Sequence, residues 1–310
     1  MGNLHGIELP ACDVIQCRDR EDWLDKHGRV MTTSDAMAAL GEDDYKSYFS
    51  LYFEKTDGAA DVDNLPMKLG RYLEPFMADE YVLATQRTVR LTPYTLCVSR
   101  EHPWLACTPD ALALPADDPR QCEFKTTSAY AADAWKNGGA PLRAQVQLIL
   151  GLAITGLRFG DLFALIGNRS LELRPIDAQS PAVVELCAEI IPALRLFWRR
   201  VEMRDPPPVD ASLSTRATLK RLYGTIDEGK EAVIPEELYD KYRRLSEATK
   251  SAETAHDIVY NQVLAAMGDA KRGVLPNGRK CFTAYEVAEH WVERYHCAAY
   301  KAVRQLKVKD

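Results

Sequence analysis

Apolar positions recur at helical spacing along much of the chain, and short apolar runs lie between these stretches. The spacing of three and four residues predicts helices over residues 34–40, 44–55, 67–86 and 141–155. Runs of β-branched, aromatic and aliphatic residues predict strands over residues 88–99, 111–114 and 122–126, and a strand pair over 161–167 and 171–177. A long amphipathic helix over 178–203, interrupted near Pro192, follows. This alternation predicts an α/β protein with a central mixed β-sheet flanked by helices.

The triple proline Pro206-Pro207-Pro208 marks a boundary, because it can continue neither a helix nor a central strand. We therefore expect a core over residues 1–205 and a mainly helical C-terminal extension over 206–310. The extension is predicted to hold a charged helix over 235–268, a hairpin over 273–283 around Pro276-Asn277-Gly278 and a last helix over 285–307.

Composition predicts a soluble, cytoplasmic protein without a membrane segment. The chain has 310 residues, 46% of them hydrophobic, which suffices for a large core. It contains no run of about 18 apolar residues, and Met1-Gly2-Asn3-Leu4-His5 does not resemble a signal peptide. The eight cysteines include no Cys-x-x-Cys pair, which argues against structural zinc and an iron–sulfur cluster and favours buried thiols.

The stretch from Thr108 to Gln147 carries the candidate chemistry. If residues 121–126 form a strand, Glu123 and Lys125 point to the same face, about 6.5 to 7 Å apart, and Phe124 points to the other. Asp110 is expected to enter the same cleft from the end of a preceding strand. Two carboxylates that close repel each other unless a divalent cation neutralises them. Oxygen ligands suit Mg²⁺ or Mn²⁺, and Lys125 would then serve an attacking water.

The spacing of an acid and a lysine two residues later is not specific by itself, because it occurs four times. The other three pairs begin at Asp44, Glu228 and Asp269, in polar contexts that favour solvated charge pairs. Only Glu123 follows the Pro109-Asp110 pair, which is unique in the chain, and precedes an amphipathic segment that carries Gln145.

Five segments together resemble one known family. They are 32–41, with Thr32-Thr33-Ser34-Asp35-Ala36 and Leu40-Gly41; 45–55, ending in Glu54-Lys55; Gly70-Arg71-Tyr72-Leu73-Glu74; His102 to Asp110; and Ala144-Gln145-Val146-Gln147. In this order and at these spacings they resemble the lambda-exonuclease or YqaJ-like viral recombinase family, a branch of the PD-(D/E)xK nucleases. The resemblance covers about residues 23–205.

The resemblance implies a role for each matching residue. Asp110, Glu123 and the backbone carbonyl of Phe124 would hold one metal ion, and Glu74 with Asp110 a second. Lys125 would serve the water. The same resemblance implies that Gln145 bonds near the reacting phosphate and that the hydroxyls of Ser34 and Thr108 cradle a 5′-phosphate. Of the two nearby glutamines we favour Gln145, expecting Gln147 to face elsewhere; Ser34 could alternatively be a helix N-cap, and Glu74 a surface acid.

The chain departs from the family pattern at two positions. Ala111 stands where the family commonly has glycine after the aspartate, so the turn there must avoid positive φ or carry strain. The arginine expected shortly after Trp23 is missing, and His27 occupies its position. The cation that binds the 5′-phosphate is therefore left open, with a nearby lysine or arginine as the replacement.

The resemblance implies a Mg²⁺-dependent deoxyribonuclease, a 5′-to-3′ exonuclease on double-stranded DNA ends that supplies 3′ single strands to an annealing protein. A PD-(D/E)xK endonuclease, another DNA-end nuclease and a catalytically inactive DNA-binding protein are the alternatives. The net charge is −6, and acids outnumber bases by eight in residues 1–205, so DNA affinity must come from local patches and metal ions. A homo-oligomer, a trimer in the resemblance, would enclose the DNA instead.

Overall fold

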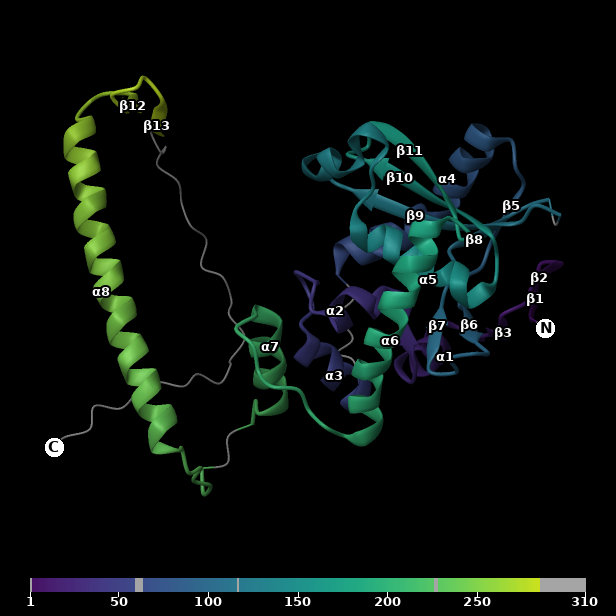
Figure 1. Ribbon diagram of the computed structural model, residues 1–310, viewed down its shortest axis with the longest axis horizontal. Coiled ribbons are helices and arrows are strands. Elements are labelled where there is room, and N and C mark those ends of the chain that lie inside the picture. The colour runs from purple at the N-terminus through teal and green to yellow at the C-terminus, as the bar shows by residue number, and fades with distance from the viewer. Residues whose placement is uncertain (1, 59–63, 116, 226–227, 285–310) are drawn as a thin grey trace. The chain divides into compact units, whose positions relative to one another are not determined.

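The chain forms two compact units, which are described separately. A computed structural model describes residues 2–58, 64–115, 117–225 and 228–284. The contacts group Met1–Leu222 into the first unit and Tyr223–Asp310 into the second. Figure 1 shows the first unit as sheets covered by helices, and this confirms the predicted α/β class.

A five-stranded mixed sheet forms the centre of the first unit, with strand order β11-β10-β9-β8-β5. Strands β9 and β10 pair in parallel, and the remaining neighbours pair antiparallel. The strands are β5 (Val89–Leu91), β8 (Ala111–Ala113), β9 (Arg120–Thr127), β10 (Phe159–Ile166) and β11 (Ser170–Asp177). The predicted strands at 111–114, 122–126, 161–167 and 171–177 are confirmed within a few residues.

Helices cover this sheet on both faces because its central strands alternate between two apolar surfaces. Cys122, Phe124 and Phe163 pack with Met77 and Tyr81 of α4 (Leu65–Thr85). The intervening β10 positions belong to the main core with α5 (Leu142–Thr155) and α6 (Pro181–Met203). The site residues of β9 thus lie on the α5 side or the α4 side according to their position in the strand.

A second, four-stranded sheet has the order β3-β6-β7-β4. Its strands are β3 (Cys12–Gln16), β4 (Met31–Thr32), β6 (Thr95–Ser99) and β7 (Leu105–Cys107). The prediction of one strand over residues 88–99 is wrong, since β5 and β6 belong to different sheets. Pro93 has no N–H for a ladder, and Tyr94 has a positive φ of 54°, so the chain turns between them. A β-hairpin of β1 (Gly2–Leu4) and β2 (Ile7–Leu9) precedes β3.

The remaining helices of the first unit include two further corrections. Helix α3 (Tyr48–Asp57) begins later than predicted, because the side chain of Ser47 caps it by accepting a hydrogen bond from Ser50 N. Helix α6 runs through Pro192 without interruption, since the buried apolar face that includes Leu194 and Phe197 offsets the lost hydrogen bond. The others are α1 (Arg20–Gly28), η1 (Thr33–Asp35), α2 (Ala36–Leu40), η2 (Ala129–Gly138) and α7 (Leu213–Leu222).

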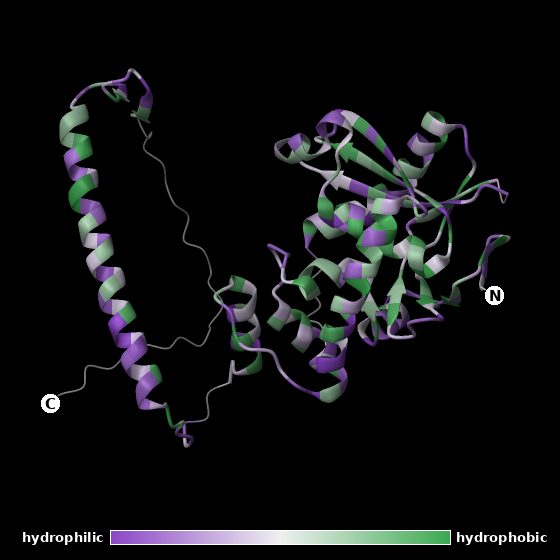
Figure 2. Cartoon of the chain, viewed as in Figure 1, coloured by the Kyte–Doolittle hydropathy of each residue, from purple (hydrophilic) through white to green (hydrophobic). Residues whose placement is uncertain are grey.

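The second unit contains α8 (Glu236–Met267), β12 (Arg272–Val274) and β13 (Lys280–Thr283). The predicted long helix and hairpin are confirmed, whereas the predicted helix over 285–307 lies outside the described residues. Helix α8 buries none of its residues, and Figure 2 shows hydrophilic and hydrophobic positions along its whole length. Among the described helices, none has the length and apolar content to cross a bilayer.

Candidate active site

The candidate residues gather where β8 and β9 separate. The pairing of the two strands runs only from Ala113 and Arg120 to Ala111 and Cys122. Beyond it, Asp110 directly precedes β8, and its Oδ2 accepts a hydrogen bond of 2.7 Å from Phe124 N. The aspartate side chain therefore accepts the hydrogen bond of a β9 amide beyond the end of the backbone pairing. Ala111 is absent from the positive-φ residues, so the turn tolerates alanine without strain there.

Glu123 and Lys125 lie on the same face of β9, as predicted. The Nζ of Lys125 donates to Glu123 Oε1 at 2.5 Å and to Gln147 Oε1 at 2.9 Å. Glu123 is 2% exposed, so this carboxylate has its ion pair in a buried setting. Phe124 points the other way, and its ring packs at 6.4 Å from that of Tyr81.

The orientation expected for Gln147 is wrong. One side of α5 faces β9, because Gly151 and Thr155 both lie against Gln121. Gln147 lies four residues before Gly151 and so belongs to the same side of the helix. Gln147 therefore reaches Lys125. The side chain of Gln145 instead donates to the carbonyl of Ala140 at 2.6 Å, and its catalytic role stays a prediction.

Glu74 approaches the two acids from the opposite layer. It lies on the stripe of α4 that also carries Met77 and Tyr81, which pack on the sheet. Burial and the carboxylate of Glu123 raise the pKa of Glu74, and Arg71 opposes the shift. Helix and strand thus bring three acids into one electrostatic neighbourhood.

Asp110 is the centre of this negative charge. Burial raises its pKa well above the usual value, and so do Glu123 and Glu74, while Lys125 and the Phe124 amide act in the other direction. An aspartate that resists ionisation for these reasons has too little positive charge around it.

The donor set suits a hard divalent cation. The described residues contain no three His, Cys, Asp or Glu side chains arranged as a metal cage. Mg²⁺, however, is commonly held by one or two carboxylates and completed by water and substrate phosphate. Asp110 and Glu123 fit that requirement, and a bound cation would relieve the charge that raises the pKa of Asp110.

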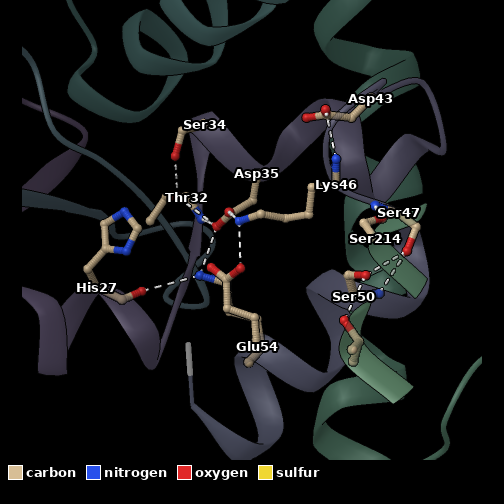
Figure 3. A network of polar contacts seen from close by, with 12 residues as sticks. His27, Thr32, Ser34, Asp35, Asp43, Lys46, Ser47, Ser50, Glu54 and Ser214 are labelled. Atoms are coloured by element: carbon tan, nitrogen blue, oxygen red, sulfur yellow. Dashed lines mark hydrogen bonds and ion pairs between the residues drawn. The ribbon is translucent and has the colours of Figure 1, made fainter. Parts of the chain in front are cut away.

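A second polar cluster surrounds Asp35, and Figure 3 shows it with α3 and α7 beside it. Asp35 is 3% exposed, and its carboxylate accepts from Lys55 Nζ at 2.8 Å and from the backbone and hydroxyl of Thr32. Lys46 Nζ lies 3.6 Å from Asp35 and 2.6 Å from Glu54. We call Asp35, Lys46, Glu54 and Lys55 the Asp35 cluster.

Two residues predicted to bind a 5′-phosphate lie near these clusters. Ser34 is exposed in η1, which packs against α5 and β7, and its hydroxyl lies 3.0 Å from that of Thr32. Thr32 and Asp35, not Ser34, are the N-cap residues of η1 and α2, so the N-cap alternative for Ser34 is wrong. Thr108 follows β7, and its buried hydroxyl has no hydrogen-bond partner in the described part of the chain.

The position of the missing arginine carries no charge at neutral pH. Burial lowers the pKa of His27 to about 4, and Lys55 and Lys46 add to the shift. Lys46 is the nearby cation with access to solvent, since its side chain is 34% exposed, whereas Lys55 is 0% exposed. Lys46 was expected to form a solvated pair with Asp44; instead it binds Asp35 and Glu54.

Comparison with known proteins finds a family similar to part of this chain. Residues 22–158 match the sequence model of the YqaJ-like viral recombinase domain. Over this stretch the chain is similar to that family. It is 25% identical over 272 residues to the uncharacterized protein YqaJ of Bacillus subtilis (strain 168), covering 85% of this chain and 83% of that protein.

Two solved structures were also found to be similar. The alkaline exonuclease of Laribacter hongkongensis is 18% identical, with 59% of this chain and 93% of that chain covered and a TM-score of 0.49. A phage related exonuclease from Haemophilus somnus 129PT is 9% identical, with 56% and 96% covered and a TM-score of 0.41.

The stretch that matches the family model contains the whole candidate site. Glu74, Asp110, Glu123, Lys125 and Gln147 all lie within residues 22–158. The Asp35 cluster lies there too, whereas α6, α7 and the second unit lie beyond the matched range.

Proposed function

We propose that this YqaJ-like protein is a metal-dependent deoxyribonuclease that degrades double-stranded DNA from its ends. The observation that carries the proposal is the junction of β8 and β9, where Asp110 is held against the Phe124 amide beside the Glu123–Lys125 pair. Two carboxylates without enough counter-charge can bind a divalent cation, and a lysine held beside them can orient a water. This combination is suited to hydrolysing a phosphodiester.

Each residue has a separate task in this proposal. Asp110, Glu123 and the carbonyl of Phe124 would hold a Mg²⁺ ion, which Mn²⁺ can replace, and Glu74 with Asp110 would hold a second. When bound, the ions neutralise charge on the phosphate and on the leaving oxygen. Lys125 has three N–H donors, and Glu123 and Gln147 accept from two of them. The third is left to orient the attacking water.

End recognition is assigned to the surface between η1 and β7. Ser34 and Thr108 would donate hydroxyls to a terminal 5′-phosphate, with Gln145 beside it. Lys46 would supply the cation that His27 cannot, because its side chain is partly exposed and Asp35 and Glu54 hold it in place. Binding the 5′ end in this way gives 5′-to-3′ digestion and leaves a 3′ single strand for a phage-type annealing protein in the cytoplasm.

A closed oligomer, which we expect to be a trimer, would keep this acidic protein on DNA. A chain with a net charge of −6 gains little attraction for DNA from its overall charge. A ring around the duplex makes digestion processive without tight binding. Light scattering should find a trimer at micromolar concentration; a monomer that digests DNA distributively in a competitor chase would refute this part.

Linear and covalently closed circular duplexes, incubated with Mg²⁺ or with EDTA, test the proposed function. Loss of linear DNA alone, only with Mg²⁺, is the expected result, and release of label from the 5′ end before the 3′ end establishes the polarity. Cleavage of the circle would indicate an endonuclease. Binding without cleavage in either buffer would indicate an inactive DNA-binding protein.

A further inference from the structure

A buried ion pair with a tyrosine joins α4 to the central sheet, away from the candidate site. Arg120 donates to both oxygens of Asp161, from Nε at 2.6 Å and from Nη2 at 2.7 Å. The hydroxyl of Tyr81 donates to Asp161 Oδ2 at 2.5 Å. Tyr81 is 0% exposed and Asp161 3% exposed. We call these three residues the Asp161 lock.

Stability alone gives a poor reason for the Asp161 lock. Removing two charges from water is costly, and apolar residues of similar volume often fill such a space equally well or better. Apolar packing already surrounds the lock, because the ring of Tyr81 meets that of Phe163 edge to face at 5.5 Å. Directional hydrogen bonds add to such packing by fixing the position of the helix relative to the sheet.

The position that the lock fixes is that of α4 along β9. Tyr81 and Glu74 are seven residues apart, so they lie on the same side of α4, two turns and about 10.5 Å from each other. On β9, Arg120 lies on the face that Phe124 turns toward α4, and Phe124 N binds Asp110. The lock thus fixes α4 on this face through Tyr81, and Glu74, two turns away on the same side of α4, acts electrostatically on Glu123 and Asp110.

We propose that the Asp161 lock is a positioning device that sets α4 against β9 and so holds the Glu74 carboxylate beside Asp110 and Glu123. This inference rests on the proposed function, because its consequence is the affinity of these acids for a divalent cation. Tyr81, Arg120 and Asp161 do not touch the reacting atoms; they act through Glu74.

The Tyr81→Phe variant tests the proposal, since it keeps the buried ring and removes only the hydroxyl. Calorimetric titration should show Mn²⁺ affinity lowered on the order of tenfold, as when outer-shell partners of metal ligands are removed. The Mg²⁺ concentration for half-maximal DNA digestion should rise by a similar factor, and excess Mg²⁺ should restore the wild-type rate. The matched control is Tyr52→Phe, which changes a buried tyrosine of α3 and should alter neither value.

The same change in a Glu74→Gln background shows whether the lock acts through Glu74. Tyr81→Phe should then alter Mn²⁺ affinity by less than about twofold, because the group that it positions is gone. A tenfold loss of Mn²⁺ affinity in both backgrounds would overturn the proposal. A second variant, Arg120→Lys, keeps the positive charge but loses the bidentate contact with Asp161. Unchanged Mn²⁺ affinity in both Tyr81→Phe and Arg120→Lys would also overturn the proposal. A wild-type protein that binds Mn²⁺ without cutting DNA would refute the proposed function but leave this test in force; one that binds no Mn²⁺ would refute both.

Discussion

Two aspartates in the first unit, Asp35 and Asp110, respond to burial in opposite ways. Burial by itself would raise the pKa of Asp35, but Lys55, Lys46 and a hydrogen bond from Lys55 hold that pKa well below its usual value. Burial raises the pKa of Asp110, and Glu123 and Glu74 raise it further against a single lysine. Asp35 therefore has its counter-charges built into the protein, whereas Asp110 lacks them.

This difference separates a structural carboxylate from one suited to a ligand. Asp35 accepts hydrogen bonds from Thr32 and an ion pair from a fully buried lysine, so its charge holds β4, η1 and α3 together. Asp110 has one amide and one lysine around it against two repelling acids. A site that leaves its own charge uncompensated favours binding of a cation from outside.

The largest expected effect concerns Lys125, the lysine beside Asp110. Lys125→Ala should lower DNA turnover by about 10²- to 10⁴-fold, the usual range for losing a group that handles the reacting proton or water. Mn²⁺ and DNA should still bind, because Asp110 and Glu123 remain. Lys136→Ala, at an exposed lysine of η2, is the control. Near-normal turnover of Lys125→Ala would remove this lysine from the mechanism.

Removing one or the other aspartate should have unequal consequences for stability. Asp35→Ala leaves Lys55 buried without its main partner, so the free energy of unfolding should fall by about 3 to 5 kcal/mol. Asp110→Ala removes a repelling charge, which offsets part of the cost of leaving the Phe124 amide without its acceptor, so the metal-free protein should lose no more than about 1 to 2 kcal/mol. Urea unfolding in EDTA measures both, and equal losses would contradict the comparison.

Acidification should weaken the Asp35 cluster through His27. The pKa of His27 is lowered to about 4 in the folded protein, below its ordinary value of 6.5, so the unfolded chain binds more protons between these values. Stability should fall as the pH drops from 6.5 to 4, by up to about 3 kcal/mol. Asp35, with its lowered pKa, adds a further loss only below about pH 4. His27→Gln should flatten the first slope in urea unfolding, whereas His256→Gln on the exposed α8 should not.

The smallest effect concerns the DNA end. Lys46→Met should reduce the preference for 5′-phosphorylated over 5′-hydroxyl duplex by about tenfold, the value of a lost charge-assisted contact of about 1.5 kcal/mol. Mg²⁺ dependence should stay unchanged, because Lys46 belongs to the Asp35 cluster. If wild type digests both ends at the same rate, the surface between η1 and β7 does not recognise the phosphate.

The sequence predicted the elements with strong periodicity and missed those defined by long-range pairing. The strand with Glu123 and Lys125 was found because alternation places both on one face. Strands β4 and β7 are only two and three residues long, and α1 buries no residue, so none of them has a readable period. Pro93 indicated a break between β5 and β6, but only the structure shows that the two strands belong to different sheets.

The site shows the same limit. Asp110, Glu123 and Lys125 were predicted because alternation along the strand places Glu123 and Lys125 on one face and the resemblance adds Asp110. Gln147 was misplaced, although the stripe Gln147, Gly151 and Thr155 indicated the inner face of α5. Lys46 pairs with Asp35 across a turn between two helices, and Asp161 pairs with Arg120 at a separation of 41 residues along the chain. No local pattern reveals such pairs.

Calorimetric titration of Mn²⁺ into wild type and into Asp110→Asn and Asp35→Asn variants tests the central difference most directly. Any Asp35→Asn protein that remains folded should bind Mn²⁺ as wild type does, since the Asp35 cluster satisfies its own charges. Asp110→Asn should lose the binding, because it removes the carboxylate whose pKa the site raises. Unchanged Mn²⁺ affinity in Asp110→Asn would contradict the account.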